Sequence, residues 1–379
     1  MNFQLTKEQE FVQKMVRDFA KAEVEPIAGD IDKEHRFPVE TVKKMARYGM
    51  MGIPFPTKYG GAGGDELSYA ITVEELAKVC ASTAVIVSAH TSLCCWPIYK
   101  YGTEEQKMKY LPDLLSGKKL GAFGLTEPGA GTDASGQQTR AVLDGDEYVL
   151  NGAKCFITNG GYADVFIIMA MTDKSLGNHG ISSFIVEKTD PGFSIGKTED
   201  KMGIHASSTT ELIFQDCRIP KDRLLGKVGK GFKVAMSTLD GGRIGIASQA
   251  LGIAEGALDV TIEYMKQRKQ FGKKLSQMQA LQFVVADLAT QIQAAKLLVY
   301  EAACTVDAGK PYTVPAAKAK LFAAETAMHV TTKCVQLYGG YGYTTDYPVE
   351  RMMRDAKITE IYEGTSEVQR MVISASLLR

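Results

Sequence analysis

Two segments of this sequence combine glycines, hydroxylated residues and a carboxylate: Gly121-Ala-Phe-Gly-Leu-Thr-Glu-Pro-Gly-Ala-Gly-Thr-Asp133 and Ile361-Tyr-Glu-Gly-Thr-Ser-Glu367. Glycines let the backbone approach a ligand closely. Thr and Ser hydroxyls can donate to an anionic or carbonyl oxygen, or accept from a donor on the ligand. A pair of turns with helix caps is the alternative, and for a segment taken alone it is the better explanation. The interpretation therefore depends on the rest of the chain.

Two further segments favour ligand binding: Gln267-Arg-Lys-Gln-Phe-Gly272 and Gln336-Leu-Tyr-Gly-Gly340. Arg268 carries a planar guanidinium that can pair with a pyrophosphate, although a surface charge on a helix is its alternative. With all four segments, the chain resembles the acyl-CoA dehydrogenase family from Leu5 through Leu378. Within that family it is most similar to the bacterial short-chain (butyryl-CoA) dehydrogenases. The identification comes from this resemblance and not from periodicity or spacing.

The resemblance implies an FAD cofactor held by the middle of the chain. The residues expected beside the isoalloxazine ring are Phe123, Leu125 and Thr126. Those expected near the pyrophosphate are Gly131 and Thr132, and Thr132 is also expected on the substrate side. Those expected to cover another flavin edge are Phe156, Ile157 and Thr158. Mitochondrial relatives usually have Trp where this chain has Phe156, so an aromatic wall is kept there.

The resemblance also implies that the cofactor site is shared between subunits. The residues expected to contact FAD held mainly by a neighbouring subunit are Arg268, Phe271, Gln279, Gln336, Leu337, Gly339 and Gly340. A site built in this way requires an oligomer, and the family implies a homotetramer.

Glu363, in a Tyr-Glu-Gly-Thr motif, matches the catalytic base of the family. The α proton of a thioester is weakly acidic, so a base must act beside a site that stabilises the developing enolate oxygen. A carboxylate in a dry apolar pocket can act as this base, because exclusion of water raises its pKa toward the working range. The resemblance places Tyr362 and Gly364 near substrate and Thr365, Ser366 and Glu367 near FAD. The alternative role for Glu363 is a cap on the following helix.

Some relatives, including isovaleryl-CoA dehydrogenases, carry their base at a second position, just before the arginine of Leu239-Asp-Gly-Gly-Arg243. This chain has Gly242 there, which leaves Glu363 as the candidate. Asp240 and Arg243 match substrate-side positions of the family. A helix cap and a surface charge are the alternative for this pair.

The resemblance implies FAD-dependent α,β-dehydrogenation of a short acyl-CoA, with butyryl-CoA to crotonyl-CoA as the best single reaction. Glu363 would remove the α proton, and flavin N5 would accept the β hydrogen as hydride. The enolate oxygen would be held by the backbone N–H of Glu363 and a ribityl hydroxyl. Electrons would be exchanged with an electron-transferring flavoprotein, in a direction that the chain does not reveal. The alternatives are a dehydrogenase or oxidase for another acyl-CoA, and a non-catalytic relative that kept FAD.

The elements that must position these residues follow the order helices, strands, helices, which predicts an α+β fold that is mostly α. We expect an N-terminal helical domain (1–120), a middle antiparallel β domain (121–228) and a C-terminal four-helix bundle (229–379). Thr6-Lys7-Glu8-Gln9 has the form of a capping box and predicts the first helix. Asn151-Gly152, between two short apolar runs, predicts a β-hairpin turn.

The composition excludes several other classes of protein. Basic and acidic residues number 44 each, so the charge balance does not indicate a nucleic-acid partner. The seven scattered cysteines predict reduced thiols, and no His/Cys spacing predicts a metal site. No targeting leader is recognised and no apolar run is expected to span a membrane, so we expect a cytoplasmic protein.

Overall fold

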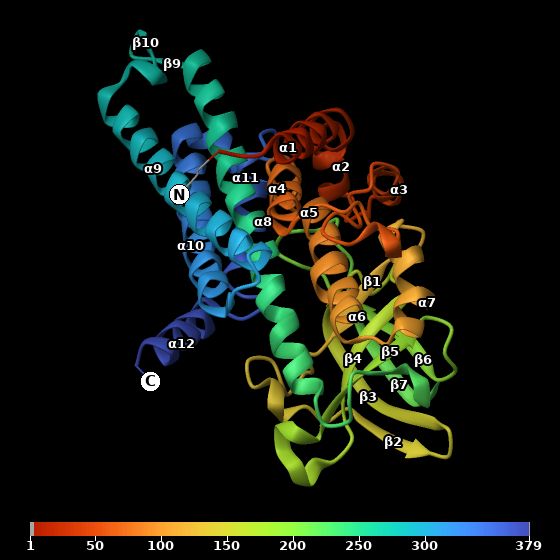
Figure 1. Ribbon diagram of the computed structural model, residues 1–379. Coiled ribbons are helices and arrows are strands. Elements are labelled where there is room, and N and C mark those ends of the chain that lie inside the picture. The colour runs from red at the N-terminus through yellow and green to blue at the C-terminus, as the bar shows by residue number, and fades with distance from the viewer. Residues whose placement is uncertain (1–3, 379) are drawn as a thin grey trace.

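The computed structural model describes residues 4–378, in which a group of helices, a group of strands and a second group of helices follow one another (Figure 1). The first group consists of α1 (Lys7–Phe19), α2 (Ala28–Lys33), α3 (Val39–Arg47), α4 (Glu66–Ala77), α5 (Ala81–Ser88), α6 (Trp96–Tyr101) and α7 (Glu104–Leu115). The strands are β1 (Gly121–Gly124), β2 (Arg140–Asp144), β3 (Glu147–Thr158), β4 (Val165–Met171), β5 (Ile181–Glu187), β6 (Phe193–Thr198), β7 (Thr209–Pro220) and β8 (Leu224–Leu225). This order confirms the predicted fold class.

The second helical group consists of α8 (Gly231–Gln267), α9 (Gln279–Asp307), α10 (Thr313–Tyr338), α11 (Val349–Thr359) and α12 (Ser366–Leu377). A short hairpin of β9 (Lys269–Gln270) and β10 (Lys273–Lys274) joins α8 to α9. In this bundle α10 packs against its four helical neighbours. The limits given above for the three domains stay a prediction.

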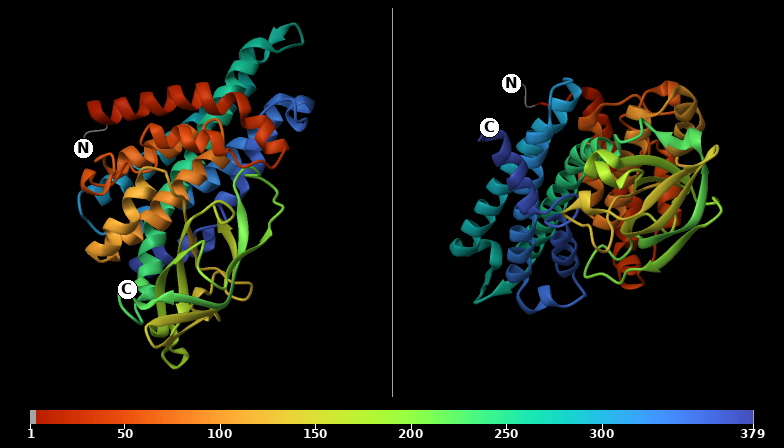
Figure 2. Two further views of the ribbon diagram at one scale, coloured as in Figure 1. Left: turned by 90° about the vertical axis from the view of Figure 1, so that its right-hand side faces the viewer. Right: turned by 90° about the horizontal axis from the view of Figure 1, so that it is seen from below.

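The two helical groups share one hydrophobic core, so they form a single body beside the sheet (Figure 2). α1 begins at the predicted capping box, in which Gln9 N–H donates to Thr6 Oγ1 and Thr6 N–H donates to Gln9 Oε1. Val16 of α1 and Leu251 of α8 lie in the same core, and α4 is buried along almost its whole length between them. The long helix α8 therefore has a fixed position relative to the N-terminal helices.

The strands form one sheet in the order β6-β7-β3-β2-β4-β5-β8, with β1 beside β4. The pairings are antiparallel as predicted, except that β1 runs parallel to β4 and Arg140 of β2 pairs in parallel with Met171 of β4. The parallel pairing arises because β1 enters from the helical group instead of from a hairpin. It brings the Gly121–Gly124 segment to the side of the sheet that faces the helices.

The predicted hairpin turn at Asn151-Gly152 is wrong. β3 runs through both residues, and β7 pairs with it from Glu147 to Thr158. The register shifts between Leu150 and Gly152, where Gly152 has φ +143, so the glycine serves a bulge and not a turn. The β2–β3 turn lies instead at Gly145, with φ +63. Long-range pairing with β7 outweighs the local preference.

The helical stretch Ala81–Tyr101 contains a π-helical turn at Ala89–Cys95, all of it buried. Such turns inside α-helices often occur at functional sites. Leu93 of this turn, Phe123 of β1 and Val234 of α8 lie in one hydrophobic cluster. The cluster joins the N-terminal helices, the sheet and α8.

Two helical stretches have the length and hydropathy of a membrane span, Ala81–Tyr101 and Gln279–Asp307. The first is a core helix, since 94% of its apolar window is buried in the protein. The second is only 22% buried, but its Lys296 forms ion pairs with Glu74 and Glu255 of other helices. Both stretches are therefore parts of the packed helical body.

Candidate functional site

Glu363 lies in the loop between α11 and α12 with φ +53, followed by Gly364 with φ +94. A positive φ is unfavourable for a residue with a side chain, so surrounding contacts must hold it. Lys320 Nζ and Gln369 Nε2 both donate to Gly364 O, at 2.7 and 2.8 Å. The cap of α12 is Thr365, whose hydroxyl accepts from a backbone N–H of the first turn. The capping alternative for Glu363 is therefore wrong.

The Glu363 carboxyl is poised to accept a proton. Its Oε2 atom is buried and has no hydrogen-bond partner within residues 4–378. Burial raises the pKa of Glu363 to about 8, although Lys320 and Arg243 oppose this rise. The backbone N–H of the same residue makes no hydrogen bond within the described chain. One residue thus presents a base and a free donor at the same place.

Helix α8 passes directly beside this carboxyl. A β carbon at Gly242 would overlap Glu363 Oε2 and would lie 2.9 Å from Leu93 Cδ2. The position that carries the base in some relatives therefore adjoins Glu363 in space. Leu93 belongs to the same hydrophobic cluster as Phe123 and Leu125. Glu363 and the Gly121–Asp133 segment accordingly lie around one cluster.

Asp240 and Arg243 form an ion pair on the same helix, in which Arg243 is buried and Asp240 is half-buried. Arg243 Nη1 donates to Asp240 Oδ1 at 2.5 Å, and Thr313 Oγ1 donates to Asp240 Oδ2 at 2.6 Å. Arg243 is only 5% exposed and its Nε has no partner in the described residues. α8 begins at Gly231, so Asp240 is not a cap, and the burial of Arg243 excludes a surface charge. The arginine faces the site with an unused donor.

Tyr362 anchors the other side of the loop between α11 and α12. Its hydroxyl donates to Gln249 Oε1 of α8, and Gln249 Nε2 donates to Ala81 O at 2.9 Å. The loop is thereby tied through α8 to the start of α5. Tyr362 cannot use the same proton for a ligand unless this bond opens.

The β-domain residues expected at the flavin come together at the ends of β1 and β3. Cys155 N–H donates to Thr126 O at 2.9 Å, which places the two segments side by side. Phe156 is 64% exposed and has φ +58, so its ring projects from the sheet. Ile157 is buried in the sheet core, and only its backbone can face a ligand. The remaining residues of this set are nearly buried (Phe123, Leu125), half-buried (Thr126, Thr158) or exposed (Gly131, Thr132).

A buried ion pair that was not predicted from the sequence holds the segment expected at the flavin. Lys154 Nζ donates to Glu127 Oε1 at 2.7 Å, to Gln137 Oε1 at 3.0 Å and to Leu125 O at 3.1 Å. Glu127 also accepts from Thr139 N–H at 3.0 Å. Both partners are buried. Burial lowers the pKa of Lys154 to about 8, and the Glu127 carboxylate opposes this by stabilising the charged ammonium. The only signal in the sequence was a lysine inside an apolar strand.

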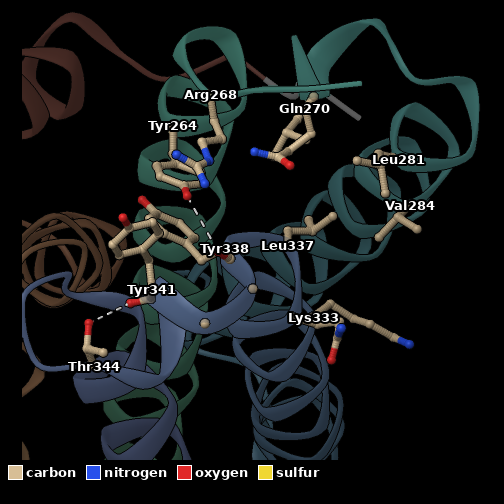
Figure 3. Close-up of a pocket in the computed structure, with 14 residues that line it drawn as sticks. Tyr264, Arg268, Gln270, Leu281, Val284, Lys333, Leu337, Tyr338, Tyr341 and Thr344 are labelled. Atoms are coloured by element: carbon tan, nitrogen blue, oxygen red, sulfur yellow. Dashed lines mark hydrogen bonds between the residues drawn. The ribbon is translucent and has the colours of Figure 1, made fainter. Parts of the chain in front are cut away.

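A separate cavity of about 660 Å³ lies where α8, α9 and α10 approach the β9–β10 hairpin (Figure 3). Its lining includes the predicted cofactor residues Arg268, Gln336, Leu337, Gly339 and Gly340. The Arg268 guanidinium lies over the Tyr341 ring, 5.2 Å from its centre. Phe271 is 94% exposed at the hairpin tip, and Gln279 is exposed at the start of α9; neither lines the cavity.

The cavity lies far from the sheet within one chain. In Figures 1 and 2 the β9–β10 hairpin projects from the end of the bundle that points away from the β domain. A single chain therefore does not bring Arg268 and Thr126 to the same ligand. The predicted site residues fall into two groups, one around Glu363 and the sheet and one around Arg268.

The residues around Glu363 fit a large polar cofactor. Ser366 Oγ, Gln369 Oε1 and Arg243 Nε are buried without partners in the described chain, so each can bond a ligand. Gly131 has open space where a β carbon would stand, which lets a phosphate approach the backbone. Glu367 is exposed beside them. No group of three potential metal ligands occurs in residues 4–378.

Three family models cover the chain: the acyl-CoA dehydrogenase N-terminal domain (6–118), middle domain (122–217) and C-terminal domain (229–378). The chain is 65% identical to a short-chain specific acyl-CoA dehydrogenase of Clostridium acetobutylicum, over all of both chains. It matches the structure of butyryl-CoA dehydrogenase from Megasphaera elsdenii with a TM-score of 0.99 and 56% identity, again over all of both chains. A chain from work on the electron transferring flavoprotein of Acidaminococcus fermentans and flavin-based electron bifurcation matches equally, with a TM-score of 0.99, 58% identity and complete coverage of both chains.

Proposed function

The chain belongs to the acyl-CoA dehydrogenase family, and we propose that it converts butyryl-CoA to crotonyl-CoA by FAD-dependent α,β-dehydrogenation. One observation carries the proposal: a buried carboxyl oxygen of Glu363, with no partner in the described chain, lies against Gly242 on a rigid helix. A base must be held in this way to remove a weakly acidic proton. The relatives named above act on short acyl-CoA thioesters, which sets the substrate class.

Each residue of the site has a part in the reaction. Glu363 takes the α proton of the thioester, and its unused backbone N–H donates to the thioester oxygen as negative charge develops there. Arg243 supplies a fixed positive charge near the carboxyl, which favours its ionised form before proton transfer. Leu93 and its cluster exclude water. Bound FAD supplies the acceptor for the β hydrogen, which leaves as hydride.

The cofactor site is completed by a second subunit. Arg268 faces a cavity far from the sheet of its own chain, so its guanidinium is available to a pyrophosphate held by a neighbour. Phe271, which is 94% exposed at the tip of the neighbouring hairpin, would add an apolar side chain to this contact. A shared site requires at least two subunits, and the family resemblance favours a homotetramer. In it, the group of residues around Glu363 and the group around Arg268 would meet across a subunit contact.

The reduced enzyme exchanges electrons with an electron-transferring flavoprotein in the cytoplasm. The A. fermentans work supports this class of partner. Phe156 is the side chain best placed to meet it, because its ring is 64% exposed at the expected flavin edge. Whether the reaction runs toward crotonyl-CoA or toward butyryl-CoA depends on the potential of that partner.

Anaerobic mixing of the purified holoenzyme with a series of acyl-CoA thioesters tests the proposal. Rapid loss of oxidised flavin absorbance that peaks with butyryl-CoA is expected. A maximum with another chain length would change the substrate, and fast reoxidation by oxygen would favour an oxidase. An enzyme that binds FAD but is bleached by none of the thioesters would overturn the dehydrogenase assignment.

A further inference from the structure

Two lysine side chains of the described chain, Lys154 and Lys320, are among its largest fully buried groups. Lys154 has a contact counter-ion, since Glu127 lies 2.7 Å from its ammonium. Lys320, on α10, makes no contact ion pair within residues 4–378, and its hydrogen bond goes to a backbone carbonyl, Gly364 O. A buried cation without a contact counter-ion is costly. Its position therefore calls for an explanation beyond packing.

The charged groups that face Lys320 point to the catalytic base. Glu363 is the carboxylate with the largest influence on it, with smaller ones from Glu360 and Glu367, while Arg243 on α8 opposes them. The cations that act on Glu363 are Lys320 and Arg243. Its other titratable neighbours are Tyr69 of α4 and Tyr362. Lys320 and Glu363 are thus each other's main charge partner without touching.

The same ammonium also holds the backbone of the base. Gly364 O receives two donors, Lys320 Nζ at 2.7 Å and Gln369 Nε2 at 2.8 Å. Glu363 just before it has φ +53, a conformation that is unfavourable for a residue with a side chain. Removing a donor from Gly364 O loosens the peptide that keeps this conformation.

We propose that Lys320 is a positioning residue of the dehydrogenation, which holds the Glu363–Gly364 peptide and provides a buried positive charge that favours the ionised form of Glu363, the form that takes the α proton. The proposal rests on the function proposed above. The proton moves from the substrate α carbon to the Glu363 carboxylate, and Lys320 donates no proton in this step. Its charge acts most strongly before proton transfer, when the carboxylate is negative.

The kinetic test compares Lys320→Met with Lys320→Arg and with Lys296→Met as a control. Lys296 is a partly buried lysine of α9 that pairs with Glu74 and Glu255. For Lys320→Met we expect the pH profile of flavin reduction by butyryl-CoA to move about one pH unit toward alkaline pH, with about tenfold loss near neutrality that shrinks as pH rises. The arginine variant should keep the wild-type midpoint, and the control should lower stability without moving it. Equal loss at every pH, or no loss, would overturn the proposal.

A second test needs neither substrate nor turnover. A double-mutant cycle of Lys320→Met and Glu363→Gln, followed by chemical denaturation, measures whether the two side chains act on each other. Each single change leaves one buried charge without its partner, whereas the double variant leaves none. We expect the double variant to be more stable than the sum of the single effects. Additive effects would overturn the proposal, and a wild-type enzyme that no thioester bleaches would instead overturn the proposed function while this cycle still stands.

Discussion

Gly242 and Glu363 are in contact across two separate elements, and the carboxyl oxygen of Glu363 occupies the space that a β carbon at position 242 would need. Gly242 is an interior residue of α8, whereas Glu363 lies in the loop before α12. Position 242 must therefore lack a side chain if the Glu363 carboxyl is to keep its orientation.

Gly242→Ala should keep the fold and lose the reaction. Alanine favours a helix over glycine by about 1 kcal/mol, but its methyl group would displace the carboxyl, and a displacement near 1 Å can cost about a hundredfold in rate. The measurement is flavin reduction by butyryl-CoA together with thermal unfolding. Gly241→Ala is the matched control, because nothing lies within 4 Å of a β carbon there. Equal rates for the two variants would show that this contact is unimportant.

Glu363→Gln should retain yellow FAD and bind acyl-CoA but lose rapid flavin reduction, because the amide keeps the shape and cannot take the proton. In the wild type the rate should rise with pH through about 8, since burial raises the pKa of Glu363 to about 8 and only the ionised form is a base. Rapid-mixing absorbance across this range measures both effects. Persistent reduction in the glutamine variant would assign the base elsewhere.

Glu66→Gln should stabilise the protein at alkaline pH and have little effect at acid pH. Burial, Asp307 and Asp65 raise the pKa of Glu66 to about 8. Because this folded-state pKa lies above the ordinary value of 4.5, its contribution to stability is complete below that value and is lost as pH rises through about 8. Each pKa unit corresponds to ~1.4 kcal/mol. Denaturation midpoints at acid and alkaline pH measure the effect, with the exposed Glu8→Gln as control; a benefit of equal size at both would contradict the linkage.

Lys154→Met should destabilise the protein by about 3–5 kcal/mol, because it leaves the Glu127 carboxylate buried without its partner. It also frees Leu125 O and Gln137 Oε1, so we expect weaker retention of FAD. Adding Glu127→Gln should restore part of the stability. Denaturation and flavin content after gel filtration are the measurements. A double variant less stable than Lys154→Met would contradict this account of the pair.

Hybrid oligomers test whether the cofactor site is shared. Arg268→Ala should bind FAD poorly, and Glu363→Gln should bind it but not react. If one subunit provides Glu363 and its neighbour provides Arg268, co-expression of the two variants restores some complete sites. Activity in purified hybrids that exceeds that of both parents supports the arrangement. No recovery in hybrids of verified composition would place both residues at the same subunit's cofactor.

The succession of helices, strands and helices can be predicted from the sequence, because hydrophobic periodicity and helix capping depend on nearby residues. The box at Thr6 and Gln9 forms as its spacing predicts. The four chemistry-bearing segments were found as well, through their resemblance to a family.

Tertiary structure decided what local rules could not. The Asn151-Gly152 turn became a bulge because pairing with β7 along the whole of β3 outweighs a two-residue preference. Only packing shows that Lys154 and Lys320 are both buried, and that Lys154 has a contact counter-ion while Lys320 has none in the described residues. The contact of Gly242 with Glu363 likewise joins residues far apart in the chain. Burial and charge partners are set by which elements pack together, and that information is spread over the whole sequence.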